Sequence, residues 1–304
     1  MHEIRLNGID GGNLLGFMAA LGTLRLLAAD AGEVRMKWQE SAGRGWVPAV
    51  VHPQIATGQE LTDLIARRVC GSETCSPAWD IGNDLTLGRG DFGARLGAAA
   101  ADSEPGRRDV VDFLAAFGSE AVGAGPKKDL MSDTEFRTMS GAGHQHFLGF
   151  MRELAASAGS EHIRRTLFES WDYADDRPSL RWDPADYRPH ALRSEDPSGD
   201  PIKTMRGANR LAIEALPLFP TVPVGRKLRT VGFQDRDGET EFTWPMWTES
   251  LSLETVSSLL ASGEIQCDAP ERASLTRRGV GQVFRAKRFT EGKYRNFSPA
   301  RALL

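Results

Sequence analysis

A proline-rich segment near the middle of the chain restricts the architecture more than any other feature of the sequence. From Asp172 to Pro201 there are five prolines and no hydrophobic period of either helix or strand. Proline interrupts both kinds of backbone hydrogen-bonding ladder, so this stretch is not expected to form a long regular element. We therefore predict an N-terminal α+β lobe over 1–170, a connecting loop over 171–201 and a C-terminal lobe over 202–304, with one continuous domain as the alternative.

Strand and helix patterns alternate irregularly on both sides of this segment. Apolar residues recur at helical spacing from Leu14 to Leu27, behind Asn13 as an N-cap, and strand patterns occupy 34–38 and 46–51. Further strand-like runs, 227–233 and 241–247, flank a hairpin turn at 235–238. Other helices are expected near 60–69, 108–117, 147–154, 162–168, 206–216 and 252–263. Because no regular βαβ succession is present, we predict an α+β fold of mixed helices and antiparallel sheet, with a C-terminal basic β-hairpin.

The charge of the chain is distributed unevenly. The formal net charge is −4, yet residues 271–304 hold nine Lys or Arg against two Glu, so this tail carries +7 and residues 1–270 carry −11. Two strand-like runs, 283–289 and 293–297, surround Glu291-Gly292. A two-residue turn there would place Arg288 opposite Arg295. Like charges directly opposite one another are destabilising, and a bound anion would relieve their repulsion.

A phosphate backbone is the anion that best suits a basic hairpin with aromatic side chains. We predict that phosphates contact Arg277, Arg278, Arg285, Lys287, Arg288, Lys293 and Arg295, with Phe289 and Tyr294 beside them. Arg206 and Asn209 are further candidates, because they begin a predicted helix and helix N-termini attract anions. The alternative is a basic strand pair docked on the acidic remainder of this protein or of a partner, with Arg206 and Asn209 in an ordinary capped helix.

The proline-rich segment contains an imperfect repeat. Residues 171–178 and 182–189, WDYADDRP and WDPADYRP, match at six of eight positions. We predict that Trp171 and Trp182 anchor a contact loop to the core, while Arg177, Arg181 and Arg188 are shared between the neighbouring aspartates and a partner. The alternative is a metal-dependent nuclease site, which would need convergent carboxylates. The carboxylates concerned are Asp172, Asp175, Asp176, Asp183 and Asp186, with His144 or His146.

The remaining site chemistries are disfavoured by spacing and composition. On a helix, His144 and His146 would diverge by roughly 200°, which does not suit a shared metal ion. Cys70, Cys75 and Cys267 form no CxxC pair, which fits a reducing cytoplasm better than a disulfide framework. There is no run of 18 apolar residues and no leader-like N-terminus. We therefore expect a cytoplasmic protein with no cofactor, no metal and no membrane span.

Several segments together resemble one known family. Residues 13–25, NLLGFMAALGTLR, resemble the GFLAALGTLR opening of proteins encoded in type I-G (formerly I-U) CRISPR loci. Residues 139–154, 179–184, 206–220 and 295–300 are also similar to that family, which is described as an extension of the CRISPR helicase-nuclease. The opening resembles, more weakly, the start of the large subunits of type I interference complexes.

The resemblance implies a role in crRNA-guided DNA interference, an antiviral defence in which protein subunits read duplex shape while the guide reads sequence. The chain shows neither the P-loop nor the His-Asp motif of the helicase-nuclease itself. We therefore expect a non-catalytic subunit or accessory protein that binds crRNA or target DNA, contacts other type I-G subunits, or recruits the helicase-nuclease. A metal-dependent nuclease acting on DNA or RNA and a protein-only assembly factor are the alternatives.

Overall fold

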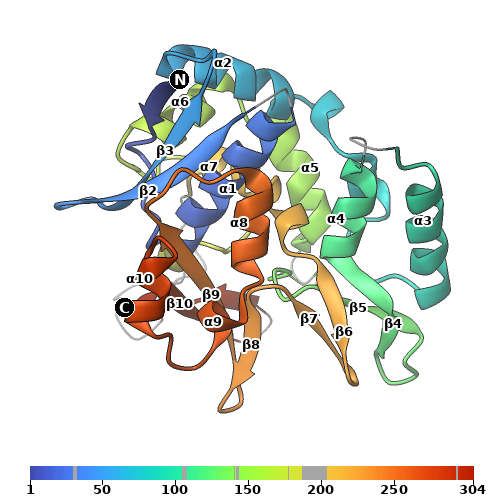
Figure 1. Ribbon diagram of the computed structural model, residues 1–304. Coiled ribbons are helices and arrows are strands. Elements are labelled where there is room, and N and C mark those ends of the chain that lie inside the picture. Colours follow the sequence, from blue (N-terminus) through green and yellow to red (C-terminus); the bar gives the residue numbers. More distant parts are fainter. Residues whose placement is uncertain are drawn as a thin grey trace, which may run out of the picture.

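The computed structural model describes residues 1–29, 33–104, 108–139, 141, 144–176, 178–186, 204–291 and 294–304 (Figure 1). Its main sheet has the strand order β11-β10-β9-β8, with β12 also paired to β10. These strands are β8 (Phe233–Arg236), β9 (Glu239–Trp247), β10 (Val280–Glu291), β11 (Tyr294–Phe297) and β12 (Arg301–Ala302). All of their pairings are antiparallel.

Three smaller sheets accompany the main one. A three-stranded sheet has the order β1-β3-β2 and contains β1 (His2–Arg5), β2 (Arg35–Ser41) and β3 (Gly45–His52). Two further sheets are hairpins, one of β4 (Gly118–Ala124) and β5 (Leu130–Asp133), the other of β6 (Thr221–Val224) and β7 (Lys227–Thr230). These pairings are antiparallel as well, and together with the helices they confirm the predicted α+β class.

Several helices surround α1, whereas α9 and α10 lie beside the strands of the main sheet (Figure 1). Their bounds are α1 (Leu14–Ala28), α2 (Gly58–Val69), α3 (Arg89–Ala101), α4 (Asp109–Phe117), α5 (Phe147–Ser157), α6 (Ser160–Phe168), α7 (Arg206–Ile213), α8 (Leu253–Leu260), α9 (Gly263–Gln266) and α10 (Arg272–Arg277). None of the helices in the described ranges is both long and apolar enough to cross a lipid bilayer.

Helix α1 lies at the centre of the packing. Asn13 caps it as predicted, because its side chain accepts hydrogen bonds from the backbone N–H groups of Leu15 and Gly16. Nearly every residue of α1 is buried, as expected of a helix that is apolar on all sides. Gly22 lets α7 approach closely, since a Cβ at this position would lie 1.8 Å from the carbonyl oxygen of Leu211.

One hydrophobic cluster extends from Ile4 to Phe297 and includes Trp182 of the proline-rich segment. In this cluster the ring of Phe17 stacks with those of Trp38 and Trp244, whose centroids are 6.0 and 5.8 Å away. The same core therefore contains side chains from both predicted lobes and from the segment between them. A boundary at 171–201 does not divide this core.

Two local differences from the predicted elements have clear causes. The run 227–233 is split, because Gly232, with φ +87°, redirects the chain between β7 and β8. The hairpin turn of β8 and β9 is Asp237-Gly238, and both residues have the positive φ that a type I′ turn requires. Helix α3 was not predicted from the Gly/Ala-rich stretch because only Phe92 of its residues is buried, which leaves no apolar stripe to detect.

Candidate nucleic-acid interface

The C-terminal hairpin is present, but its register differs from the predicted one. Arg288 pairs with Phe297, Thr290 with Arg295 and Glu291 with Tyr294. The predicted direct pair of Arg288 and Arg295 is therefore wrong. The shift changes each partner by two residues and leaves the faces unchanged. Arg288 and Arg295 remain diagonal neighbours on the same face of the hairpin.

These two arginines converge on one acceptor. Nη2 of Arg288 lies 3.1 Å from the carbonyl oxygen of Arg137, and Nη1 of Arg295 lies 3.3 Å from the same oxygen. Within the described part of the chain, neither guanidinium has a carboxylate at ion-pair distance. Burial, together with the neighbouring charge of Arg295, lowers the pKa of Arg288 to about 10. The Nε of Arg288 is enclosed without a hydrogen-bond partner among the described residues.

Arg137 holds the shared carbonyl in place. Its side chain pairs with Asp84, at 2.9 Å, and with Asp133, and it donates to the carbonyl oxygen of Met139 at 2.9 Å. The backbone N–H of Arg295 donates to the carbonyl oxygen of Thr138 at 3.1 Å. The hairpin is thus attached to the 137–139 segment through both backbone and side-chain hydrogen bonds, which fixes the position of the two guanidiniums.

Arg181 connects the repeat segment to the same hairpin. Its Nη2 donates to Oε1 of Gln145 at 3.1 Å, and its Nη1 lies 3.4 Å from Oδ1 of Asn296 in β11. Arg181 adopts φ +58°, and nearby His144 adopts φ +60°. Left-handed backbone of this kind is uncommon outside glycine and gathers at functional sites. The predicted contact of Arg181 with a partner has to be corrected, because its side chain is buried.

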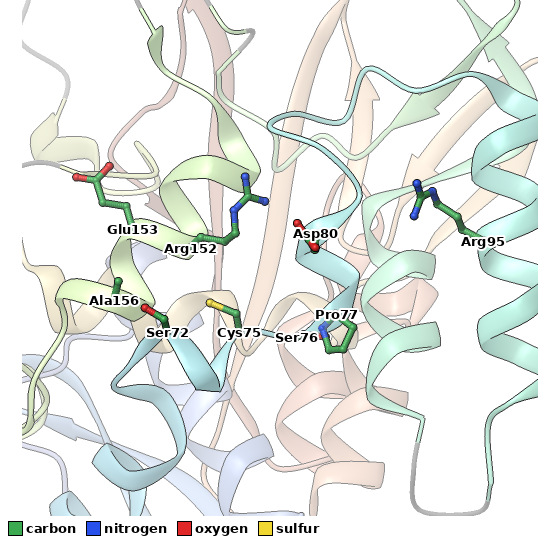
Figure 2. Close-up of a pocket in the computed structure, with 9 residues that line it drawn as sticks. All are labelled: Ser72, Cys75, Ser76, Pro77, Asp80, Arg95, Arg152, Glu153 and Ala156. Atoms are coloured by element: carbon green, nitrogen blue, oxygen red, sulfur yellow. The ribbon is translucent and has the colours of Figure 1, made fainter.

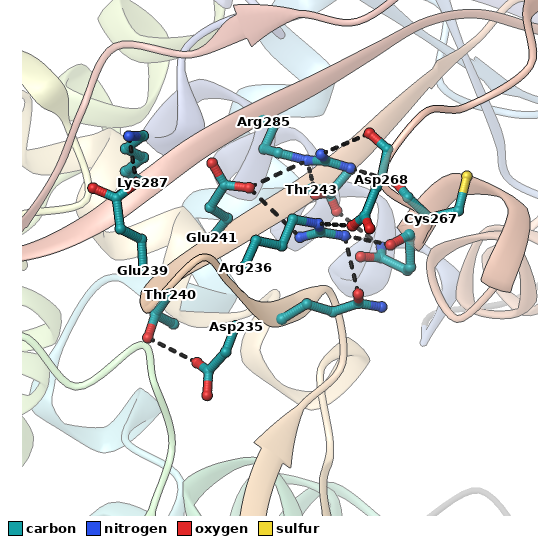
Figure 3. Close-up of polar contacts among 12 residues, drawn as sticks. Asp235, Arg236, Glu239, Thr240, Glu241, Thr243, Cys267, Asp268, Arg285 and Lys287 are labelled. Atoms are coloured by element: carbon teal, nitrogen blue, oxygen red, sulfur yellow. Dashed lines mark hydrogen bonds and ion pairs between the residues drawn. The ribbon is translucent and has the colours of Figure 1, made fainter.

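Arg285 and Lys287 both lie at ion-pair distance from glutamates of β9, but Arg285 is buried and Lys287 is exposed (Figure 3). Arg285 is 2% exposed and donates to Oγ1 of Thr243 at 2.9 Å and to the carbonyl oxygen of Cys267 at 2.6 Å. Lys287 pairs with Glu239. The predicted phosphate contact of Arg285 is wrong, because a guanidinium so enclosed cannot reach a nucleic-acid backbone.

The acidic strand β9 accounts for much of the tail's excess charge. Glu241 lies 3.8 Å from Arg285, 3.7 Å from Arg236 and 3.0 Å from Arg301. Further along the tail, Arg278 pairs with Glu264 at 2.7 Å. These contacts match the alternative of a basic strand pair docked on the acidic remainder of the same chain. Arg277, by contrast, is exposed and has no ion pair among the described residues.

The N-terminus of α7 is already occupied by a carboxylate of the protein. The backbone N–H of Arg206 donates to Oδ2 of Asp175 at 2.9 Å, and its guanidinium reaches backbone carbonyl oxygens. Asn209 is fully buried: its Oδ1 accepts from the N–H of Leu180 at 2.8 Å, and its Nδ2 donates to Thr204 at 3.0 Å. The predicted phosphate contact of Asn209 is therefore wrong, and an anion at Arg206 would have to displace Asp175.

Two aspartates of the repeat share one arginine, whereas Asp183 has other partners. Asp172 and Asp175 both pair with Arg165 of α6, at 2.5 and 3.1 Å. Asp183 is buried and accepts from Nδ2 of Asn13 and from the hydroxyl of Tyr173, each at 3.1 Å. Burial raises the pKa of the Asp183 carboxyl. Across the residues that the structure describes, no three His, Cys, Asp or Glu side chains form a metal-binding group.

The aromatic residues of the repeat lie against the core. Trp182 is fully buried, its indole N–H donates to the carbonyl oxygen of Phe136 at 2.9 Å, and its ring meets that of Phe136 edge-on. Trp171 is partly buried, and its indole N–H donates to the carbonyl oxygen of Thr166 at 3.1 Å. Phe289 is half-buried on β10. The predicted roles of Arg177, Arg188 and Lys293 fall outside the described residues, as does the side chain of Tyr294.

His144 and His146 lie in different surroundings. His146 precedes α5 without capping it through its side chain, and its Nδ1 lies 3.9 Å from Oδ2 of Asp84. His144, two residues earlier in the chain, is exposed. Because Asp84 also pairs with Arg137, His146 belongs to the surroundings of the arginine pair.

A separate cavity of about 750 Å³ lies between α3, the 72–80 segment and α5 (Figure 2). Arg152 lines it but donates to the carbonyl oxygens of Trp79 and Gly82, so its guanidinium fixes the adjoining turn. Burial raises the pKa of the Cys75 thiol, which keeps it protonated and a poor nucleophile. The side chain of Arg95 extends from α3 in the direction of Asp80. This arrangement offers mixed charges but no activated nucleophile.

Comparisons with known proteins yield no relative on which a function could be based. No family model, no curated protein and no solved structure matches this chain.

Proposed function

We propose that this chain is a non-catalytic, nucleic-acid-binding subunit or accessory protein of a type I-G CRISPR interference complex. The observation that carries the proposal is the convergence of Arg288 and Arg295 on one carbonyl oxygen, without a carboxylate at ion-pair distance in the described part of the chain. The resemblance of residues 13–25 and the other similar segments supplies the biological setting. crRNA or target DNA is the ligand, and other interference subunits or the helicase-nuclease are the protein partners.

Electrostatics favour an anion beside this pair. Repulsion from Arg295 adds to burial in lowering the pKa of Arg288, so the charged form of Arg288 is destabilised in the unliganded protein. A phosphate placed against both guanidiniums would reverse that effect and supply acceptors for their terminal N–H groups. Arginine forks suit phosphate geometry particularly well.

The test compares two classes of basic residue in the same tail. Arg288→Gln and Arg295→Gln should each weaken binding of labelled DNA or RNA by roughly tenfold or more, because hydrogen bonds to charged groups contribute about 1.5–3 kcal/mol. Arg278→Gln is the matched control, since it removes an exposed charge that is paired with Glu264. Fluorescence anisotropy measures the affinities.

Fold and charge effects are separated by two further measurements. Thermal unfolding shows whether Arg288→Gln leaves the protein folded, and Arg288→Lys retains the charge without the planar fork. Equal affinities of the wild type, Arg288→Gln and Arg295→Gln, with all three proteins folded, would contradict the proposal.

A protein-only assembly factor is the second candidate. It is favoured by the internal pairing of Arg278, Lys287 and Arg301 with carboxylates of the same chain, which leaves fewer cations for nucleic acid. Purification of an assembled complex decides between the two. Stoichiometric protein partners, together with no measurable affinity of the chain for DNA or RNA, would favour the assembly factor.

A further inference from the structure

Large apolar side chains are almost completely enclosed in this molecule, and β6 is the exception. Among the described residues, the exposed large hydrophobic side chains are those of Met1, Val222 (44%) and Val224 (57%). The two valines lie two positions apart on a strand, so they project from the same face of the β6–β7 hairpin. Apolar surface kept in water next to a groove is typical of a binding site.

Such a groove, of about 390 Å³, begins at these valines. The β6–β7 hairpin forms one wall, strand β8 forms the other, and the end of α8 with Leu260 and Ala261 closes the inner side. Figure 1 shows β8 and the β6–β7 hairpin extending side by side below α8.

Strand β8 contributes a free backbone edge to this groove. In the described part of the chain, β8 pairs only with β9. The two-residue turn Asp237-Gly238 makes the residues on either side of it, Arg236 and Glu239, a hydrogen-bonded pair. Hydrogen-bonded and non-hydrogen-bonded pairs alternate along an antiparallel ladder, so Gln234 also directs its N–H and C=O toward β9. The N–H and C=O of Asp235 therefore point away from β9, into the groove that Asp235 lines. Such an edge is a template for an added strand.

The hairpin wall adds positive charge to the apolar surface. Arg229 is opposite Val222 and Lys227 is opposite Val224, so both cations share the face of the valines. Each pairs with the carboxylate of Asp235, at 2.5 and 2.9 Å, and Arg229 also lies 3.8 Å from Glu135. Arg226, in the adjoining turn, is exposed and has no ion pair within the described ranges. The three cations thus exceed these two carboxylates by one positive charge, which makes the wall complementary to an occupant that is apolar and acidic.

We propose that this groove binds an extended acidic segment of a partner protein, which adds a strand to β8 and places apolar side chains against Val222, Val224 and Leu260. Backbone hydrogen bonds to Asp235 would supply affinity, and the excess positive charge of the hairpin wall, carried by Arg226, would select acidic residues. A second copy of this chain fits less well, because symmetric pairing through β8 would bring the same cationic wall against itself.

The experiment uses the full chain and a fluorescein-labelled peptide of about eight residues in which Val and Glu alternate, a typical strand length. Fluorescence anisotropy should show saturable binding. Val222→Thr combined with Val224→Thr keeps the β-branched shape and should weaken that binding by about tenfold or more, because two apolar contacts are lost. A peptide with Lys in place of Glu should bind at least about tenfold more weakly.

Backbone pairing is tested by N-methylated peptides. Methylation at every second residue blocks one edge of the peptide, so only one of the two alternative methylation patterns should abolish binding. Equal affinity for both patterns, or for the wild type and the Val→Thr double variant, would overturn the proposal. Concentration-dependent dimerisation that is lost in the double variant would likewise overturn it and assign the groove to a second copy of the chain.

The double variant also separates this site from the arginine pair. Its affinity for DNA or RNA should equal that of the wild type, because Val222 and Val224 belong to a different sheet from Arg288 and Arg295. A failed peptide experiment therefore leaves the nucleic-acid proposal unaffected.

Discussion

At the scale of single residues, the buried side chain of His52 stabilises the turn that follows β3 by accepting backbone hydrogen bonds. His52, the last residue of β3, is 5% exposed, and its Nδ1 accepts hydrogen bonds from the N–H groups of Gln54 and Ile55, each at 3.0 Å. This contact requires a neutral imidazole, because a protonated Nδ1 would have no lone pair to offer. Burial accordingly lowers the pKa of His52.

A pH dependence of stability follows from His52. Its pKa is lower in the folded state than in the unfolded chain, so the unfolded chain binds a proton first on acidification. The free energy of unfolding should therefore fall as the pH decreases below about 6.5. His52→Asn keeps an acceptor but does not titrate, so urea titrations at pH 7.5 and 5.5 should show a smaller difference for the variant. An unchanged difference would mean that His52 is not the responsible group.

The residue scale is also where prediction from the sequence was weakest. The sequence predicts that Arg285 and Lys287 belong to one basic patch. In the structure, Arg285 is enclosed by β9 and the 267–268 segment, whereas Lys287 pairs with Glu239. The contacts of these two residues depend on which carboxylates lie on the neighbouring strand, and no local sequence pattern encodes that. Arg137 and Gln145, which position the arginine site, carried no distinguishing signal for the same reason.

At the scale of elements, capping residues and periodic apolar positions predicted most of the helices, but not α3, α9 and α10. Asn13 and Ser252 cap α1 and α8 through hydrogen bonds to the first-turn N–H groups. The register of the C-terminal hairpin was harder, because two adjacent residue pairs could each have formed the turn. Tertiary contacts coincide with the observed choice: Phe297 is fully buried, and the N–H of Arg295 bonds to Thr138.

Two glycine substitutions test the packing of the elements. Gly22→Ala should destabilise the fold by about 3 kcal/mol or more, because its Cβ would collide with the carbonyl oxygen of Leu211 in α7. Gly97→Ala in α3 is the matched control, since nothing lies within 4 Å of the position that its new methyl group would take. It should stabilise the protein by roughly 0.5–1 kcal/mol. Equal effects in chemical denaturation would refute the close approach of α1 and α7.

At the scale of the whole molecule, the opposite charges of tail and body are largely brought together by folding. The +7 tail contains β10, whose neighbour β9 carries Glu239 and Glu241, so much of the apparent basic surface is neutralised internally. The composition shows that charge is distributed unevenly along the chain, but not which charges meet in the folded protein. Among the described tail residues, Arg272, Arg277, Arg288 and Arg295 have no carboxylate at ion-pair distance, and of these Arg288 and Arg295 share one acceptor.

The most direct test of that site is the salt dependence of nucleic-acid affinity. For the wild type and for the Arg288→Gln/Arg295→Gln double variant, the logarithm of the binding constant is measured against the logarithm of the salt concentration. If both arginines contact phosphates, the slope should become less steep by about 1.4 for a single strand or about 1.8 for a duplex, whereas Arg278→Gln should leave it unchanged. Parallel lines for the wild type and the double variant would contradict the account.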